Sequence, residues 1–232
     1  MPDTDVAESQ LNRLCQTCGA PCNGRFCAQC GQREFKGRHT LRRFVAGALQ
    51  RTVGEEGALH TARQLTVRPG RVIRDYLAGR TIRYVHPATY LLLGVAFFAL
   101  VLGVVGGPTG AGETERLFTL LVIPFVVVAS RMVFWRGPFN FAEHLIVVLY
   151  LAGHVLVILA ATYGVVLLVP RSFAGSAALA WFAIGAGYFV WGYSRIFEER
   201  PIRAAGAALA ALSIGILVWL AFTLILVTLL RR

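Results

Sequence analysis

The chain has 232 residues, of which 56% are hydrophobic and 15% are charged, and its formal net charge is +11. A disordered chain needs low hydrophobicity, and a soluble domain of this size carries about a quarter charged residues, so the composition argues against both classes. Residues 1–85 hold 14 of the 23 basic side chains, whereas apolar runs fill the sequence from residue 91 onward. We therefore expect an all-α polytopic membrane bundle preceded by a basic N-terminal region.

The first ten residues are acidic and polar and lack an apolar run, so we do not expect a secretory signal peptide. Two C-x-x-C-G turns follow, with eight residues between them. Each turn directs two thiolates toward one metal ion, and four thiolates form the closed tetrahedral shell of structural zinc. The spacing therefore predicts a small zinc ribbon in residues 1–36, with zinc as a structural cofactor and with these ligands: Cys15, Cys18, Cys27 and Cys30.

Cys22 fits the spacing of neither turn, and we expect it to be a non-ligand. Disulfides or a redox C-x-x-C pair are the alternative, but the sequence lacks the βαβ pattern of a thioredoxin-type site. Basic residues surround the ribbon, yet Phe26 and Phe35 do not amount to a base-stacking pattern. Nucleic-acid binding is therefore disfavoured, and we expect a protein partner at the ribbon.

Residues 37–85 predict basic amphipathic helices that lie on the membrane surface. Thr40 is the expected N-cap of a first helix, and a second short helix is expected over 61–66. A third is predicted to begin at Pro69 and to end at Gly79.

Residues 36–85 carry 11 basic and 3 acidic side chains, which favours contact with anionic lipid headgroups of the cytoplasmic leaflet. In the first interpretation this contact merely orients the bundle. In the sharper one, it includes a specific lipid-headgroup or anionic-ligand site formed by Arg68, Arg71, Arg74, Arg80 and Arg83.

Residues 86–232 contain about five apolar segments, each near the 20 residues that a membrane-spanning helix needs. The basic residues between them follow the positive-inside rule when the N-terminus is cytoplasmic, and five spans then place the C-terminus outside. The predicted spans are roughly 87–106, 117–135, 143–169, 174–194 and 204–230.

The third span carries a candidate intramembrane polar site, because ionisable groups are costly in a bilayer. Three of its residues, Glu143, Tyr150 and His154, are spaced to lie on one helical face, which suggests a proton or ion relay. In the alternative, which we favour for Glu143 and His144, these two lie at the cytoplasmic interface and Glu143 pairs with Arg131 or Arg136. For His154 a hydrogen bond within the bundle and a functional role both stay open. The candidate residues are Glu143, His144, Tyr150 and His154.

Several motifs together resemble a bacterial membrane family that is classified as a domain of unknown function with an N-terminal zinc ribbon. The resemblance spans about residues 15–160, and Cys22 departs from it. It implies a zinc-ribbon protein of the bacterial inner membrane but brings no known reaction. The residues that carry it are Cys15-x-x-Cys18-Gly, Phe26-Cys27-x-x-Cys30-Gly-Gln32, the run Arg68–Arg80, Tyr84, Pro87 and Asn140–His144.

Motifs for an enzyme are missing, since the sequence has no G-x-S-x-G, H-E-x-x-H or phosphate-binding glycine loop. The first hypothesis is therefore a non-enzymatic membrane protein whose ribbon and basic helices form a cytoplasmic interaction platform or scaffold. The alternative is a transporter of lipid or a small molecule, with Arg71, Arg74 and the Glu143/His154 face lining its path.

Overall fold

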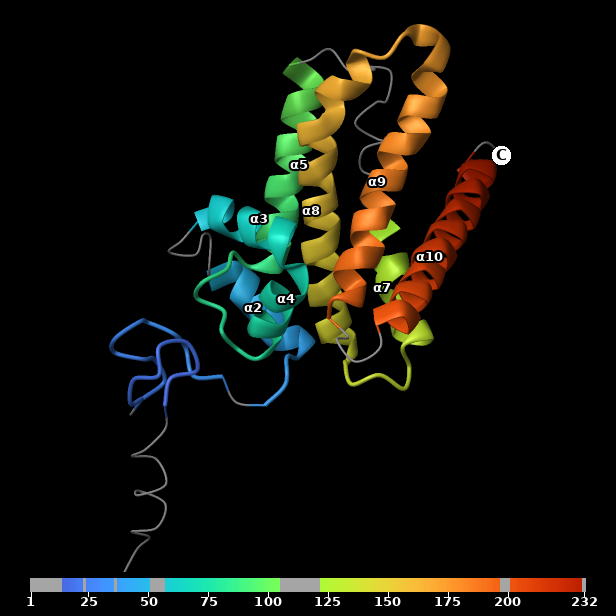
Figure 1. Ribbon diagram of the computed structural model, residues 1–232. Helices are drawn as coiled ribbons and strands as arrows, with labels where there is room; N and C mark the ends of the chain where they lie inside the picture. The colour runs from blue at the N-terminus through green and yellow to red at the C-terminus, as the bar shows by residue number, and fades with distance from the viewer. Residues whose placement is uncertain are drawn as a thin grey trace, which may run out of the picture.

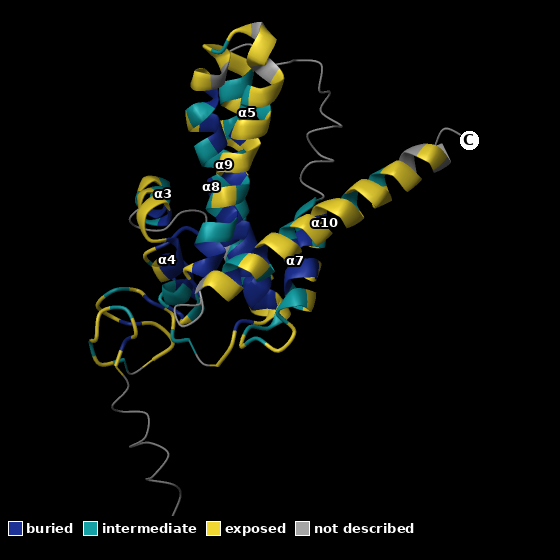
Figure 2. Cartoon of the chain, turned by 45° about the vertical axis from the view of Figure 1, so that its right-hand side comes forward, coloured by how far each residue is buried: buried dark blue, intermediate teal, exposed yellow. Residues whose placement is uncertain are grey.

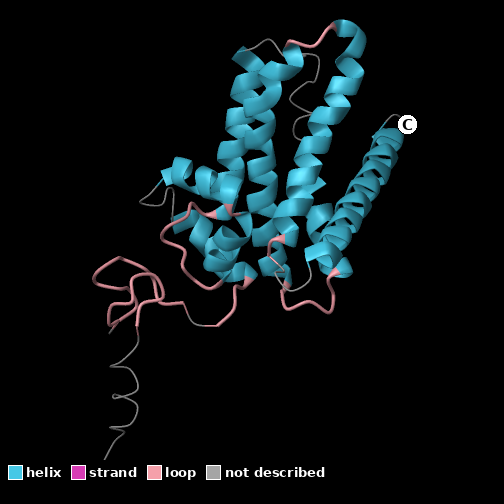
Figure 3. Cartoon of the chain, viewed as in Figure 1, coloured by secondary structure: helices cyan, strands magenta, loops and turns pink. Residues whose placement is uncertain are grey.

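The computed structural model describes residues 14–22, 24–35, 37–50, 57–104, 122–196 and 201–230. Over these residues it is all-helical, apart from two isolated β-bridges near the N-terminus, which confirms the predicted fold class (Figure 1; Figure 3). The described helices are α2 (Leu41–Gln50), α3 (Gly57–Val67), α4 (Pro69–Leu77), α5 (Pro87–Val104), α7 (Val122–Val133), α8 (Phe141–Leu167), the 3-10 helix η1 (Arg171–Phe173), α9 (Ala174–Ser194) and α10 (Pro201–Leu230).

Four of the five predicted spans are present as helices long and apolar enough to cross a membrane, and they belong to α5, α8, α9 and α10. The segment 117–135, predicted as a fifth span, contains the 12-residue apolar helix α7, and residues 117–121 lie outside the described part of the chain. We use the term base for the end of the bundle at which α5, α8 and α10 begin. The N-terminal segments lie beside the base (Figure 1).

Helix α8 is the central helix of the bundle. Of its span, 56% is buried, against 17–22% for the other three candidate spans. Large apolar side chains are exposed on the surrounding helices, among them Leu92, Leu179 and Leu217. Figure 2 shows that exposed residues run along much of α5 and α10. Such exposed apolar faces suit helices whose outer surface meets lipid rather than water.

Helices α5 and α8 cross with their backbones in direct contact. A Cβ atom built on Gly94 would lie 2.5 Å from the carbonyl oxygen of Gly153, and one on Gly153 would lie 3.0 Å from the Cα atom of Leu91. Small residues permit this approach, and in a membrane the resulting van der Waals packing is a main source of helix association.

Local sequence signals set the ends of the N-terminal helices. The backbone N–H of Arg43 donates to the Thr40 hydroxyl at 3.4 Å, so Thr40 caps α2 as predicted. Pro69 is the first residue of α4. Gly79, at φ +90°, ends that helix, with the N–H groups of Gly79 and Arg80 donating to the carbonyls of Tyr76 and Asp75. These are the two bonds of a Schellman motif.

Two details of the predicted linker are wrong. The second helix is longer than 61–66, running from Gly57 to Val67. The apolar stripe of α4 does not face lipid, because Val72, Ile73 and Tyr76 are buried in the core shared with α8 and α9. The amphipathic pattern of α4 therefore reflects packing against the bundle.

The α5–α8 crossing gives a stability prediction. We expect Gly94→Ala to lower the free energy of unfolding by about 1–3 kcal/mol, because its new methyl group overlaps the Gly153 carbonyl. Gly103→Ala is the matched control on the same helix, where an added Cβ meets nothing within 4 Å. Thermal unfolding in detergent, followed by tryptophan fluorescence, measures both, and equal midpoints for the two variants would contradict the close crossing.

Candidate functional site

The four predicted metal ligands come together. Their sulfur atoms all lie within 4.8 Å of one another, and the Cys15–Cys30 and Cys18–Cys27 Sγ pairs are each 3.5 Å apart. A disulfide would need about 2.05 Å, so these cysteines are thiols. Four sulfurs at about 2.3 Å from one tetrahedral ion would be separated by roughly 3.8 Å, so the arrangement fits a four-thiolate metal site.

The two cysteine turns share one local structure, repeated twelve residues apart. Cys15 and Cys27 each donate a backbone N–H to the carbonyl five residues ahead, at 2.7 and 2.8 Å. Gly19 and Gly31 have φ of +74° and +70°, the conformation for which glycine is favoured. The backbone N–H groups of the turn, chiefly that of Cys30, lower the pKa of Cys27 to about 6, and the pKa of Cys15 is also lowered. Burial raises the pKa of Cys30 to about 12, and the pKa of Cys18 is raised as well. The lowered pKa values favour the thiolate form at Cys15 and Cys27.

Cys22 lies half-buried beside the cluster but outside the group of four, in accord with its predicted role as a non-ligand. We refer to residues 14–35, which contain both turns, as the four-cysteine module.

One side of the four-cysteine module is fixed to the connection between α4 and α5. The buried Gln32 amide donates to the Gly79 carbonyl at 2.7 Å and to the Thr81 hydroxyl at 3.3 Å, and its oxygen accepts the Ile82 N–H at 3.0 Å. Phe35 packs so closely on Gly79 that a Cβ there would lie 2.5 Å from the phenyl ring. The module is therefore held against the base of the bundle.

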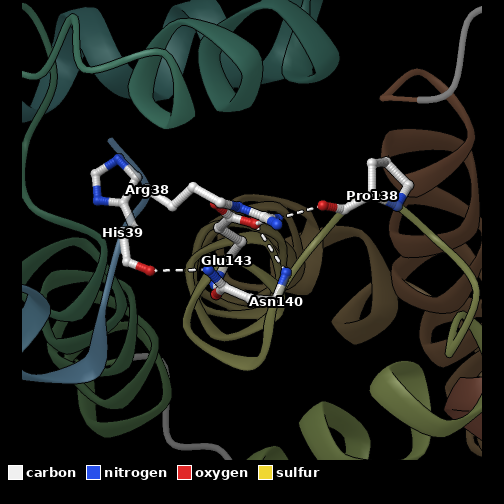
Figure 4. A network of polar contacts seen from close by, with 5 residues as sticks. All are labelled: Arg38, His39, Pro138, Asn140 and Glu143. Atoms are coloured by element: carbon white, nitrogen blue, oxygen red, sulfur yellow. Dashed lines mark hydrogen bonds and ion pairs between the residues drawn. The ribbon is translucent and has the colours of Figure 1, made fainter. Parts of the chain in front are cut away.

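The predicted intramembrane residue Glu143 lies in a polar network at the start of α8 (Figure 4). Asn140 and Glu143 cap each other reciprocally: the Asn140 side chain accepts the Glu143 N–H at 2.9 Å, and the Glu143 carboxylate accepts the Asn140 N–H at 2.8 Å. This arrangement is a capping box. The Arg38 guanidinium donates to the same carboxylate and to the Pro138 carbonyl, and Asn140 donates to the His39 carbonyl.

The predicted partners of Glu143, Arg131 and Arg136, are therefore wrong. The Arg131 guanidinium turns to the Trp135 carbonyl at 3.1 Å, and that of Arg136 lies over the Trp135 ring. Arg38, 105 residues before Glu143 in the chain, takes their place.

His154 joins three helices in the core of the bundle. Its ring nitrogens lie 3.0 Å from the Thr66 hydroxyl on α3 and 2.7 Å from the Tyr90 hydroxyl on α5. Thr66 also donates to the Ala62 carbonyl, so a neutral His154 that donates from Nε2 and accepts at Nδ1 satisfies every one of these bonds. Tyr150, one turn toward the base, donates to the Val85 carbonyl at 2.6 Å.

His144 belongs to a separate buried group. Its Nδ1 lies 2.7 Å from the Tyr193 hydroxyl and 3.3 Å from the Ser130 hydroxyl, and its Nε2 is buried without a hydrogen-bond partner among the described residues. The four candidate polar residues therefore do not form one continuous relay. They divide among the capping box, the His154 group, the His144 group and the Val85 contact.

The five predicted anion-binding arginines also divide. The side chains of Arg80 and Arg71 approach Asp75, at 2.5 and 4.0 Å, and Arg83 is exposed beyond α4. A hollow of about 400 Å³ lies at the start of α4, lined by Arg68, Arg71, Arg74 and, from the end of α9, Arg195. Sequence reasoning missed Arg195 because it lies more than 100 residues from the others.

A larger groove of about 880 Å³ lies between the four-cysteine module and helices α2 and α4. Its lining combines aromatic, basic and buried polar side chains with one acidic side chain, and it includes Phe26, Phe35, Arg33, Arg42, His39 and Glu34. Phe26 is 61% exposed, an unusual position for a phenylalanine in so small a module.

Gln32 supplies a stability prediction for this site. We expect Gln32→Ala to loosen the four-cysteine module, because the part-buried Ile82 N–H and the buried Gly79 carbonyl lose their partner, a cost of about 1–3 kcal/mol. Hydrogen exchange of residues 79–84 in the purified protein should quicken about tenfold. Gln29→Ala, at an exposed position in the same module, should not change it, and the same exchange in both variants would contradict the docking.

Comparison with known proteins matches a limited part of the chain. A family model described as a protein of unknown function, DUF3667, matches residues 55–99. This match is narrower than the resemblance over residues 15–160, and among the described elements it takes in α3, α4 and most of α5. No curated protein and no solved structure matches the chain. Residues 55–99 are thus similar to a domain of unknown function, and this similarity supplies no reaction.

Proposed function

We propose that the chain is a non-enzymatic protein of the bacterial inner membrane whose cytoplasmic zinc ribbon is a docking platform for an acidic protein segment. The observation that carries the proposal is the groove beside the docked four-cysteine module. Gln32 and Phe35, which fix the module to the bundle, line this groove together with the exposed Phe26 and with Arg33. A module held rigidly while presenting an aromatic and basic surface suits recognition of another protein.

Zinc is the metal that the donor set favours, because four thiolates at tetrahedral spacing are typical of closed structural zinc sites. Cys15, Cys18, Cys27 and Cys30 would hold it. A segment this short cannot bury a core of its own, so metal binding would supply the folding free energy of the four-cysteine module. The metal would therefore have a structural role.

Charge and thiol chemistry support the proposed cytoplasmic position of the four-cysteine module. Arg131, in the last turn of α7, and Arg136 shortly precede α8, and Arg195 lies between α9 and α10, so these basic residues lie at the base, the same end as the four-cysteine module. The positive-inside rule assigns such an end to the cytoplasm. Free cysteines persist in that compartment because it keeps thiols reduced.

The alternative of transport has less support. A path lined by Glu143 and His154 needs these groups available to a passing ligand. Glu143 instead caps α8 and pairs with Arg38, and both ring nitrogens of His154 have partners. Nothing in the described part of the chain favours transport over the platform.

The zinc site gives the first test of this proposal. The purified full chain should contain about one zinc per molecule by elemental mass spectrometry. Cys18→Ser should reduce the zinc content severely, because three thiolates leave the shell incomplete. Cys22→Ser should retain the wild-type content, since Cys22 lies outside the group of four. A metal-free wild type that still protects residues 14–35 from proteolysis would contradict structural zinc.

The platform is tested in living cells by a photo-crosslinking amino acid at Phe26, with the same amino acid at the exposed Leu59 on α3 as the positional control. We expect a discrete protein adduct from position 26 that is absent from position 59. Arg42→Glu should reduce it several-fold by repelling an acidic segment.

Arg63→Glu makes the same charge change at an exposed site on α3, and it should leave the adduct intact. Identical adducts from positions 26 and 59, or equal loss with both charge reversals, would refute the platform.

A further inference from the structure

The hollow at the start of α4 lies where α4 meets the end of α9, two segments that are distant in the sequence. The first turn of α4 abuts the end of α9, where a Cβ on Gly70 would lie 2.2 Å from the Arg195 carbonyl oxygen. The Arg74 guanidinium donates to that same carbonyl at 2.5 Å. Gly70 allows the two helix ends to approach closely, and the Arg74 hydrogen bond holds them together. The side chains around this junction therefore keep their positions relative to one another.

The lining of the hollow is strongly basic. Arg68, Arg71 and Arg195 are exposed around it, and Arg74 also lines it. Its described lining contains no acidic side chain, although the Asp75 carboxylate lies 4.0 Å from the Arg71 guanidinium. Helix α4 begins here without a side-chain cap. The positive end of its dipole therefore adds to the four guanidinium groups.

The position of the hollow relative to the membrane can be judged from the residues packed beside it along the bundle. Trp191, which lines the hollow, packs on Tyr188 with 5.7 Å between ring centroids, and Tyr188 packs on His154 at 5.0 Å. His154 in turn bonds Tyr90, in the first turn of α5. Trp191 therefore lies about level with Pro87, where the α5 span begins.

A span that begins at Pro87 and covers 18 residues is about 27 Å long, which is close to the thickness of the hydrocarbon layer. The headgroup region should therefore lie at the level of Pro87 and Trp191. Tryptophan is enriched at that depth, and arginine side chains extend to it. The adjacent Val67, which ends α3, is 62% exposed and can meet the first carbons of an acyl chain.

We propose that this hollow binds the phosphate of an anionic phospholipid from the leaflet at the base of the bundle. Guanidinium groups recognise phosphate by paired hydrogen bonds, and Arg68, Arg71 and Arg195 approach from two different helices. The site is independent of the four-cysteine module and its partner. Arg80 and Arg83, also predicted for an anionic site, do not line it.

The test uses the purified full chain, titrated in neutral detergent with phosphatidylglycerol or with phosphatidylcholine and followed by native mass spectrometry. We expect one phosphatidylglycerol to bind at least about tenfold more tightly than phosphatidylcholine. Each arginine at an anionic surface contributes about fivefold to affinity, so the variant Arg68→Gln/Arg71→Gln/Arg195→Gln should lose about 100-fold.

Arg83→Gln is the matched control, since it removes one exposed charge of the same linker outside the hollow. It should retain wild-type binding. Arg195→Gln alone leaves α4 untouched, and it should weaken binding about fivefold even if the triple variant fails to fold. Arg74 is kept because its guanidinium supports the junction.

Inorganic phosphate distinguishes the source of the ligand. If millimolar phosphate displaces the lipid, or binds as tightly without it, the ligand is a soluble phosphate and the lipid assignment is overturned. No preference for phosphatidylglycerol over phosphatidylcholine also overturns it. So does an equal loss of binding in Arg195→Gln and Arg83→Gln, which would indicate unspecific charge.

Discussion

The first turn of α8 has backbone N–H groups that need partners, and a donor that is buried there without a partner is costly. Asn140 and Glu143 meet this need between them, and the carboxylate that does so then requires a cation. Arg38 provides it. Since α8 packs against α5, α7 and α9, the position of its first turn determines where the surrounding helices lie.

The partner of that carboxylate comes from the segment between the four-cysteine module and α2, so the same contact ties the N-terminal region to the bundle. The Arg38 side chain is 57% exposed and that of Glu143 is 7% exposed. Exposed ion pairs contribute little by charge alone. The contact is important because Glu143 is buried, and a buried carboxylate without a partner would be strongly unfavourable. The N-terminal region is thus held at Arg38 and again at Gln32.

The sequence predicted the features that depend on neighbouring residues. The cysteine turns, the N-cap at Thr40, Pro69 and Gly79 at the ends of α4, and the apolar lengths of four spans are all local. Glu143 shows where this reasoning fails, because nearness in sequence suggested Arg131 and Arg136 as partners. The Asn-x-x-Glu spacing of Asn140 and Glu143 was a readable capping-box signal, whereas nothing local points to Arg38.

The partners of His154 illustrate the same limit. An imidazole in a predicted span suggests function because ionisable groups are expensive there. Its contacts, Thr66 and Tyr90, lie 88 and 64 residues earlier in the chain, and without them no sequence argument can decide between a relay and a structural hydrogen bond. Because both ring nitrogens of His154 have hydrogen-bond partners, the ring links α3 to α5 and α8.

An amphipathic helix pattern states which side of a helix is apolar, but not whether lipid or protein covers that side. In α4 the cover is protein, since Val72 and Ile73 are fully buried. In α3, by contrast, the side chains of Leu59 and Val67 are exposed. The basic charge of the linker divides accordingly, because Arg38 serves docking and Arg80 pairs with Asp75. The arginines around the hollow, which α4 turns outward by burying its apolar face, are then the ones placed to meet the anionic leaflet.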